Sequence, residues 1–482
     1  MIDPINTVPP LMDYIDGQFI PPTNTLPQWN HDPNSGEPIQ QQHTTSPEKL
    51  ERALQVADRI HRDGRWRDLP PSERANLLEQ AADWLAARVD EIGMLEAHTT
   101  GIIINTSKMV NQITHLTYRA AAGQLRDGWT DTTLPGPHGD IEILRRPWGP
   151  AACIAPWNAP AALAAHKVAN ALAAGCPVIL KPSEWAPYSA VYLAQAAEAV
   201  GIPSGVFQIV NGGAEVGAAL VSDPRIRCVS FTGGLHGGRA VAQTCAVDFK
   251  PLQLELGGNN AMIVLDDADL DATAVGIVAG MTTLNGQWCR ALGRLLVQEN
   301  IYNDLMERAF DALAAVKIGH SLDATSQMGP LVHKRHKDHV ATAVAHLRAK
   351  GGTIHQVTPM PDLPGTYFPP TLITGIDPEE TLEEIFGPVS AIHTFTTDTE
   401  AAAFANQAPY GLGGYVFGSE ERALAVARQM ETGGVKINGV SLIGLHPMAP
   451  RPAWKLSGIG EEGTAETFQF FCGTRVVGIA GT

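Results

Sequence analysis

The feature that most constrains the fold is a regular alternation of apolar runs and helical patterns between residues 145 and 256. The expected strands cover residues 152–155, 178–180, 206–210 and 228–231, and the expected helices cover a segment through His166 to Ala174 and residues 186–199, 214–221 and 236–246. Short connections between such elements are typical of a parallel sheet with helices on its faces. The sequence therefore predicts an α/β fold, in which ligands gather at the carboxyl ends of the strands.

Further elements flank this region. One helix is expected from Pro47, with Ser46 as its cap, and another near Pro71. Two extended runs around Pro135-Gly136-Pro137 predict a hairpin, and a second alternating segment follows Gly257-Gly258 to about residue 440. A chain of 482 residues exceeds what one hydrophobic core usually serves, so more than one domain is expected.

Composition excludes several classes of function. The net charge of −16 argues against a nucleic-acid partner. No run of about 18 apolar residues exists, and residues 1–22 lack a secretory signal pattern, so we expect no membrane partner and a cytoplasmic location. The six cysteines include no CxxC pair and no zinc spacing, which predicts free thiols, mostly small buried side chains, and no metal.

Three residues suggest covalent chemistry on a carbonyl group. Cys289 lies in Asn285-Gly286-Gln287-Trp288-Cys289-Arg290, and a thiolate is the strongest side-chain nucleophile near neutral pH. Glu255 ends an apolar run and precedes two glycines, where a carboxylate can act as a general base. Asn158, in Pro156-Trp157-Asn158, can donate to an oxyanion. Taken singly, each also fits a structural position: a buried thiol, a solvated loop carboxylate and a turn residue.

Two segments suggest a nucleotide. The strand 178–180 is followed by Lys181-Pro182-Ser183-Glu184, where a lysine suits phosphate or ribose oxygens and a glutamate suits ribose hydroxyls. Alternatively, the two form a surface ion pair. The run 231–238 is a glycine-rich turn before a helix, where phosphate is favoured, although its spacing differs from GxGxxG.

Together, the motifs PWN, KPSE, FTG, ELGG, GQxC, EIFGP and KxSGxG, in this order, resemble the aldehyde dehydrogenase family over nearly the whole chain. The resemblance implies that Cys289 attacks an aldehyde, that Asn158 and the Cys289 N–H hold the oxyanion, and that hydride passes to NAD. NADP is a possible alternative cofactor. Glu255 would activate the water that hydrolyses the thioester, and Lys167 and Glu462 would pass protons from that base.

The resemblance also implies a cofactor site. Lys181 and Glu184 would hold the adenosine ribose, and Glu384 and Phe386 would position the nicotinamide ribose. The remaining expected cofactor contacts are Trp157, Ser183, Gly213, Gly217, Phe231, Thr232, Gly233, Gly234, Leu256 and Gly257. The implied fold has a doubly wound cofactor domain (residues 1–126 and 148–256), an α/β catalytic domain (257–445), and a β oligomerisation flap with a C-terminal segment (127–147 and 446–482). A homodimer or homotetramer is expected.

The sequence departs from the family pattern in places. Gly234 replaces the serine of FTGS, Glu461 replaces the arginine of GRE, and residues 450–454 replace a glycine-rich stretch near the substrate entrance. Two rival functions stay open: a CoA-acylating semialdehyde dehydrogenase, whose members generally lack the ELGG glutamate, and a catalytically silent binding protein on the same fold. The aldehyde is not identified. Arg290 would suit a substrate carboxylate or a structural ion pair.

Overall fold

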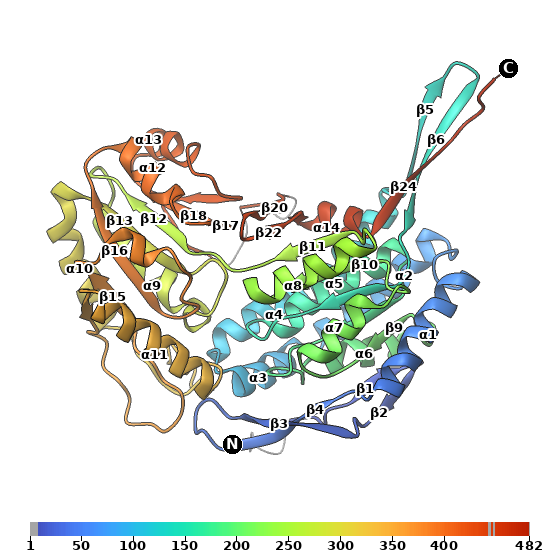
Figure 1. Ribbon diagram of the computed structural model, residues 1–482, viewed down its shortest axis with the longest axis horizontal. Helices are drawn as coiled ribbons and strands as arrows, with labels where there is room; N and C mark the ends of the chain where they lie inside the picture. The colour runs from blue at the N-terminus through green and yellow to red at the C-terminus, as the bar shows by residue number, and fades with distance from the viewer. Residues whose placement is uncertain (1–7, 442–444, 447–448, 482) are drawn as a thin grey trace.

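The computed structural model describes residues 8–441, 445–446 and 449–481, and it contains two large sheets in separate lobes (Figure 1). The predicted α/β class is confirmed. Among the described residues, no helix is both long and apolar enough to cross a membrane. All six cysteines are free; five are buried, as expected, and Cys289 is partly exposed.

The first sheet has eight strands, and its central five are parallel. Its order is β2 (Gln18–Ile20), β1 (Asp13–Ile15), β9 (Phe207–Ile209), β8 (Val178–Lys181), β7 (Ala151–Ile154), β10 (Cys228–Thr232), β11 (Leu252–Glu255) and β22 (Gly458–Ile459). From β7 the chain winds outward through β8 to β9, and then returns to the other side of β7 as β10. The strand order therefore reverses between β7 and β10, which is where ligands bind in such sheets.

Helices cover both faces of this sheet because successive strand residues point to opposite sides. Val178 and Leu180 of β8 pack into one core cluster, whereas Ile179 packs into another. The first face carries α2 (Pro71–Ala86), α4 (Ile104–Arg126), α5 (Pro160–Ala174) and α6 (Ala190–Ala199), and the second carries α1 (Pro47–Asp63), α7 (Ala214–Ser222) and α8 (Leu235–Val247). The Ser46 hydroxyl accepts from the Lys49 N–H, so the predicted cap of α1 is confirmed.

One predicted helix boundary was wrong. Residues 186–189 are not helical, with a bend at 186 and a turn at 188–189, and α6 begins only at Ala190. Pro187 explains the difference, because proline lacks an N–H and disfavours helical backbone in the residue before it.

The second sheet has seven strands and follows the two glycines after β11. Its order is β14 (Thr353–His355), β15 (Thr371–Thr374), β16 (Val389–Phe395), β13 (Leu292–Gln298), β12 (Asn260–Val264), β18 (Gly414–Phe417) and β19 (Val435–Ile437). Its helices are α9 (Leu270–Thr282), α10 (Tyr302–Ala314), α11 (Lys334–Ala349), α12 (Asp398–Asn406) and α13 (Glu420–Ala427), with 3₁₀ turns η2 (Thr283–Gly286), η3 (Glu299–Ile301) and η4 (Pro378–Thr381).

A three-stranded flap projects from the body of the molecule (Figure 1). The predicted hairpin is confirmed as β5 (Asp131–Gly136) and β6 (Gly139–Pro147), and the C-terminal strand β24 (Cys472–Val477) pairs with β6. Short pairs join β17 (Tyr410–Gly411) to β21 (Trp454–Lys455) and β20 (Arg451–Pro452) to β23 (Glu461–Glu462), and α14 (Thr464–Phe470) precedes β24.

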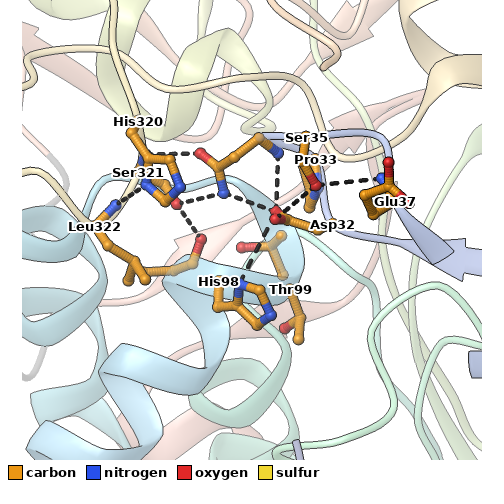
Figure 2. A network of polar contacts seen from close by, with 12 residues as sticks. Asp32, Pro33, Ser35, Glu37, His98, Thr99, His320, Ser321 and Leu322 are labelled. Carbon is orange, nitrogen blue, oxygen red and sulfur yellow. Dashed lines mark hydrogen bonds and ion pairs between the residues drawn. The ribbon is translucent and has the colours of Figure 1, made fainter. Parts of the chain in front are cut away.

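A polar network ties the N-terminal segment to both lobes (Figure 2). It lies at the turn between β3 (Asn24–His31) and β4 (Pro38–Thr44), at the end of α3 (Val89–Thr100). The buried Asn34 amide donates to Asp32 and Ser321, and it accepts from the Ser321 N–H at 2.8 Å. The Ser321 hydroxyl in turn donates to the Ala97 carbonyl. These contacts fix the loop before α11 against the first lobe.

Candidate active site

Cys289 lies in the turn between η2 and β13. Part of this turn has left-handed backbone, and buried side-chain amides stabilise it. Leu284, Asn285 and Gly286 all have left-handed φ angles, of 49°, 58° and 73°. A side chain on Gly286 would collide with the Gly387–Pro388 backbone, so only glycine fits there. This packing places the turn directly against the EIFGP segment.

The Asn285 side chain binds the turn to two neighbouring loops. It donates to the carbonyls of Gly101 and Pro330 at 2.8 and 2.9 Å, and it accepts from the Gly329 N–H at 2.8 Å. Such a fully bonded buried amide holds one backbone geometry. On the other side, the Asn260 side chain donates to the Cys289 carbonyl at 2.9 Å.

Asn158 lies beside this turn, as its predicted role requires. It follows β7 at the point where the strand order reverses, and its Nδ2 donates to the Gln287 carbonyl at 2.9 Å. Gln287 is two residues before Cys289. The structure therefore brings the predicted oxyanion donor and the predicted nucleophile together from opposite lobes.

The electrostatics of Cys289 favour the thiol over the thiolate. Burial raises its pKa to about 12, the Arg290 charge opposes this rise, and Glu255 adds to it. Arg290 itself donates through Nη1 to the Leu412 carbonyl at 3.0 Å. Its guanidinium is therefore partly held by backbone, and no carboxylate among the described residues pairs with it.

Glu255 ends β11, one strand away from the reversal point. It is 8% exposed, and its Oε1 has no hydrogen-bond partner among the described residues. Burial and the neighbouring Glu462 raise the pKa of Glu255 to about 8. Gly258, three residues after Glu255, lies close to the backbone of the nucleophile, since a Cβ on Gly258 would lie 2.8 Å from the Cys289 carbonyl oxygen. A buried carboxyl with a pKa near neutrality is suited to general-base work.

Glu462 and Lys167 lie in the same group of buried charges. Arg451 and His166 lie 3.5 and 3.8 Å from the Glu462 carboxylate. Burial would raise the pKa of Glu462, but the charges around it lower the pKa to about 2. The His166 charge is the largest of these, followed by Arg451 and Lys167. Burial lowers the pKa of His166 to about 4, so that ring is neutral near pH 7 but protonated in the acidic range where Glu462 titrates.

Lys167 is fully buried and is held by a short chain of hydrogen bonds. Its Nζ donates to the Ser230 hydroxyl at 2.9 Å, and Ser230 donates to Gln253 at 2.8 Å. Gln253 then donates to the Glu461 carbonyl at 2.9 Å. This series of hydrogen bonds links α5 to β10, β11 and β23, and it fixes the lysine side chain near Glu255 and Glu462.

Lys181 and Glu184 form a pair at the carboxyl end of β8. The Lys181 Nζ lies 3.6 Å from Glu184 Oε2 and donates to the Pro182 carbonyl. Ser183 accepts from the Trp185 N–H at 3.3 Å, which shapes the turn. A Cβ on Gly217 would lie 3.5 Å from the Lys181 side chain, so this glycine of α7 leaves space over the lysine. Gly213 caps the same helix.

The glycine turn after β10 lies next to Glu255. Thr232 is the register partner of Glu255, and the Gly233 N–H donates to the Glu255 carbonyl. The Phe231 ring packs over Gly233, and the Thr232 hydroxyl is buried without a described partner. Gly234 caps α8, and a Cβ there would meet nothing within 4 Å. No steric reason therefore excludes the serine that the family pattern expects.

Glu384 closes over the two glycines after β11. Its Oε1 accepts from the Gly258 N–H at 2.8 Å, and a Cβ on Gly257 would collide with the carboxylate. Burial raises the pKa of Glu384 to about 7. Leu256 is buried against Gly238 of α8, so the whole segment is closely packed.

Aromatic and imidazole rings gather beside Phe386. The Trp157 ring lies 5.4 Å from Phe386 and 5.2 Å from His336. Because a carbonyl only accepts, His336 must donate through Nε2 to the Phe386 carbonyl, 2.6 Å away. His333 caps α11 and lies 3.9 Å from the ring of Trp185. The start of α11 therefore supports both the Trp157 loop and the EIFGP segment.

Sequence reasoning missed several residues of this region: Ser230, Gln253, Asn260, His333, His336 and Arg451. Their types are common, and only the fold brings them near the motifs. Asn260 had one usable signal, because a polar residue at the start of a buried strand requires a partner. No group of three or more histidine, cysteine or acidic side chains in the described ranges is arranged to hold a metal ion.

Comparisons with known proteins agree with this arrangement. The chain is 35% identical to the glutarate-semialdehyde dehydrogenase of Pseudomonas aeruginosa over 94% of each protein. It is 34% identical to a betaine aldehyde dehydrogenase of Cereibacter sphaeroides, again over 94% of each. Among solved structures, an NAD-dependent aldehyde dehydrogenase from Sinorhizobium meliloti superposes with a TM-score of 0.93 at 31% identity, covering 99% of this chain and 96% of that one.

A betaine aldehyde dehydrogenase from Staphylococcus aureus in complex with NAD+ superposes equally well, at 30% identity, over 99% of this chain and 95% of that one. The sequence model of the aldehyde dehydrogenase family matches residues 22–477. With that match over nearly its full length, and with relatives above 30% identity, the chain belongs to the aldehyde dehydrogenase family.

Proposed function

We propose that the protein oxidises an aldehyde to a carboxylic acid with NAD through a thioester on Cys289. Membership of the family makes it an NAD-dependent oxidoreductase that acts on aldehydes. One observation supports the residue assignment above all. Asn158 and the Glu255–Gly258 segment both contact the turn that carries Cys289, and these residues come from both lobes.

The described residues fit a dinucleotide. The Thr232 hydroxyl is buried and lacks a partner, and the turn beside it has free space at Gly234. The Lys181–Glu184 pair offers one cation and one acceptor at the end of β8, two strands away from β10 in the same sheet. We assign the adenosine ribose to this pair, and the nicotinamide side to Glu384, Phe386 and Trp157. When bound, NAD supplies the acceptor for the hydride.

In the proposed reaction the Cys289 thiol first loses its proton to water, and the resulting thiolate adds to the aldehyde carbon and forms a thiohemiacetal. Asn158 Nδ2 and the Cys289 N–H stabilise the oxyanion. Loss of hydride leaves a thioester. Glu255 then takes a proton from water, and the hydroxide attacks the acyl carbon and releases the acid and the thiol. Lys167 and Glu462 hold and pass on the proton near Glu255.

We also propose a separate function for each part of the chain. Residues 1–126 and 148–256 bind the cofactor, residues 257–445 form the catalytic domain that carries the nucleophile, and residues 127–147 and 446–482 form the oligomerisation flap and a C-terminal segment. Residues 1–7, 442–444, 447–448 and 482 in these ranges lie outside the described part of the chain. A homodimer or homotetramer and a cytoplasmic location stay predictions.

The test of the activity is NADH absorbance from an aldehyde panel with NAD and without CoA. We expect steady turnover that CoA does not raise. A strict requirement for CoA would instead support the acylating alternative, and no turnover with any aldehyde would support a silent binding protein. The relatives are named for different aldehydes, so kcat/KM across the panel must identify the substrate.

A further inference from the structure

A cavity of about 830 Å³ lies at the base of the flap, apart from the candidate active site. Its walls are the segment before α2, the first turn of α2, and the lower ends of β6 and β24. None of the candidate active-site residues lines it. The volume is within the range of cavities that hold small molecules, roughly 300–1,000 Å³.

The lining is strongly basic in a protein whose net charge is −16. Five arginines line the cavity, namely Arg67, Arg74, Arg145, Arg146 and Arg475. Its acidic lining residues are Asp68 and Asp131, and both already have partners. Asp68 accepts from Arg67 at 3.0 Å, and Asp131 accepts from Arg146 at 2.7 Å. Three guanidinium groups therefore have no carboxylate in the lining.

The most informative of the three is Arg74, because it is only 4% exposed. Its Nη1 donates to the carbonyls of Leu69 and Arg67 at 2.7 and 3.0 Å. Its Nε is buried and donates to no described residue. A buried guanidinium without a counter-charge is costly, so an anion in the cavity would remove an unfavourable interaction.

The other two, Arg145 and Arg475, lie on adjacent strands of the flap base. Arg145 is the register partner of Thr474 and Arg475 that of Leu144, so the two side chains leave opposite faces of the flap base, and both residues line the cavity. In the described part of the chain, neither guanidinium forms an ion pair with a carboxylate. His61 completes the wall, and burial and the charge of Arg67 lower its pKa, so it is neutral near pH 7.

We propose that this cavity binds a compact polyanion that carries at least two phosphate groups. The planar guanidinium fork matches phosphate oxygens in pairs, and three arginines without a carboxylate partner in one lining favour several phosphates over one carboxylate. Because Arg74 lies deep in the wall, a small ligand reaches it more readily than the surface of another subunit does. The site is independent of the dehydrogenase reaction.

The test is calorimetric titration of tripolyphosphate into the full-length protein saturated with NAD, so that the cofactor site is already filled. We expect one binding event per chain, and at least a tenfold weaker affinity in the double variant Arg145→Gln, Arg475→Gln. The control is Arg308→Gln, whose guanidinium pairs with Asp271 in the other lobe. Dehydrogenase activity should be unchanged in all three proteins.

A second measurement covers the case in which the double variant folds poorly. Millimolar tripolyphosphate should raise the Tm of the wild-type and Arg308→Gln proteins, because a ligand of the native state stabilises it. Absence of binding to the wild-type protein, or equal affinity in the double variant, overturns the proposal. A third outcome also overturns it. If the wild-type protein does not bind tripolyphosphate and the double variant has a different molecular mass in light scattering, another subunit fills the cavity.

Discussion

Glu255 and Glu462 share one group of buried charges but titrate far apart. Burial and the charge of Glu462 raise the pKa of Glu255 to about 8, whereas the cations near Glu462 lower its pKa. Two neighbouring carboxyls with separated pKa values can take different roles. The proposed base is therefore largely protonated at pH 7 and becomes active as the pH rises.

This predicts the pH dependence of turnover. Where hydrolysis of the thioester limits the rate, kcat should rise with pH through an apparent pKa of about 8, because only the ionised Glu255 accepts a proton from water. In Glu255→Gln this limb should disappear, and kcat should fall by roughly 10²-fold or more. A pH profile that is the same in both proteins would show that Glu255 is not the base.

A second prediction concerns the influence of Glu462 on that limb. Glu462→Gln removes a negative charge that raises the pKa of Glu255, so the limb should move to lower pH. Glu461→Gln is the matched control, because its side chain is exposed on the same short strand. A limb that stays in place in Glu462→Gln, or moves equally in both variants, would contradict the electrostatic coupling.

A third prediction concerns the choice of cofactor. NADP carries an additional phosphate on the adenosine ribose, and the Glu184 carboxylate would repel it. Lys181, 3.6 Å away, offsets part of this repulsion. We expect kcat/KM to favour NAD by at least tenfold, about 1.4 kcal/mol, and Glu184→Ser to narrow the gap by improving NADP. Glu215→Gln, an exposed change on α7, should leave the ratio unaltered.

At the scale of elements, the turn that carries Cys289 depends on the Asn285 amide. Asn285→Ala removes its three hydrogen bonds to Gly101, Pro330 and Gly329, and leaves a buried N–H without a partner. We expect a loss of about 2 kcal/mol or more in the free energy of unfolding.

The loss in Asn285→Ala has two contributions, namely the missing hydrogen bonds and the strain of placing alanine at a left-handed φ. Asn285→Gly separates them, because glycine accepts this φ but forms none of these bonds. Both variants should show a lower Tm and a lower kcat than the wild type. An Asn285→Gly protein with wild-type stability would show that strain alone, and not hydrogen bonding, explains the effect in Asn285→Ala. Asn300→Ala, at an exposed asparagine, is the control.

The elements of the first lobe were largely predictable, because apolar runs such as 178–180 are short, buried and separated by helical patterns. The start of α6 was not, since Pro187 allows a turn that the pattern of apolar residues does not reveal. The pairing of β11 with β22 was also beyond reach, because their residues lie about 200 positions apart. Long-range pairs of this kind carry no local signal.

The candidate site was predictable to the extent that its residues belong to motifs. Asn158, Glu255 and Cys289 each have a plausible structural explanation alone, and only the order of the motifs favours chemistry. The supporting residues lack such a signal. Arg451 lies in a segment that departs from the family pattern, and its contact with Glu462 depends on the pairing of β20 with β23.

For the molecule as a whole, the flap is a projecting sheet that exposes several apolar side chains. Val476, Ile479 and Leu134 are 65%, 72% and 52% exposed. Exposed apolar groups on a projecting sheet are typical of subunit contacts. If the proposed oligomer forms there, Val476→Asp should lower the molecular mass measured by light scattering. Val275→Asp, on the exposed face of α9, should not. Equal masses for the wild type and both variants would place any subunit contact elsewhere.

In the proposed reaction the aldehyde becomes a thioester on Cys289. Mixing Glu255→Gln with an aldehyde substrate and NAD, followed by intact and peptide mass spectrometry, tests it most directly, because acylation proceeds while hydrolysis is slowed. We expect about one NADH per chain in the first turnover. An added acyl mass should be confined to the peptide that contains Cys289, and it should be absent from the double variant Glu255→Gln, Cys289→Ala. An acyl group on another residue, or NADH formation by the Cys289→Ala protein at the wild-type rate, would contradict it.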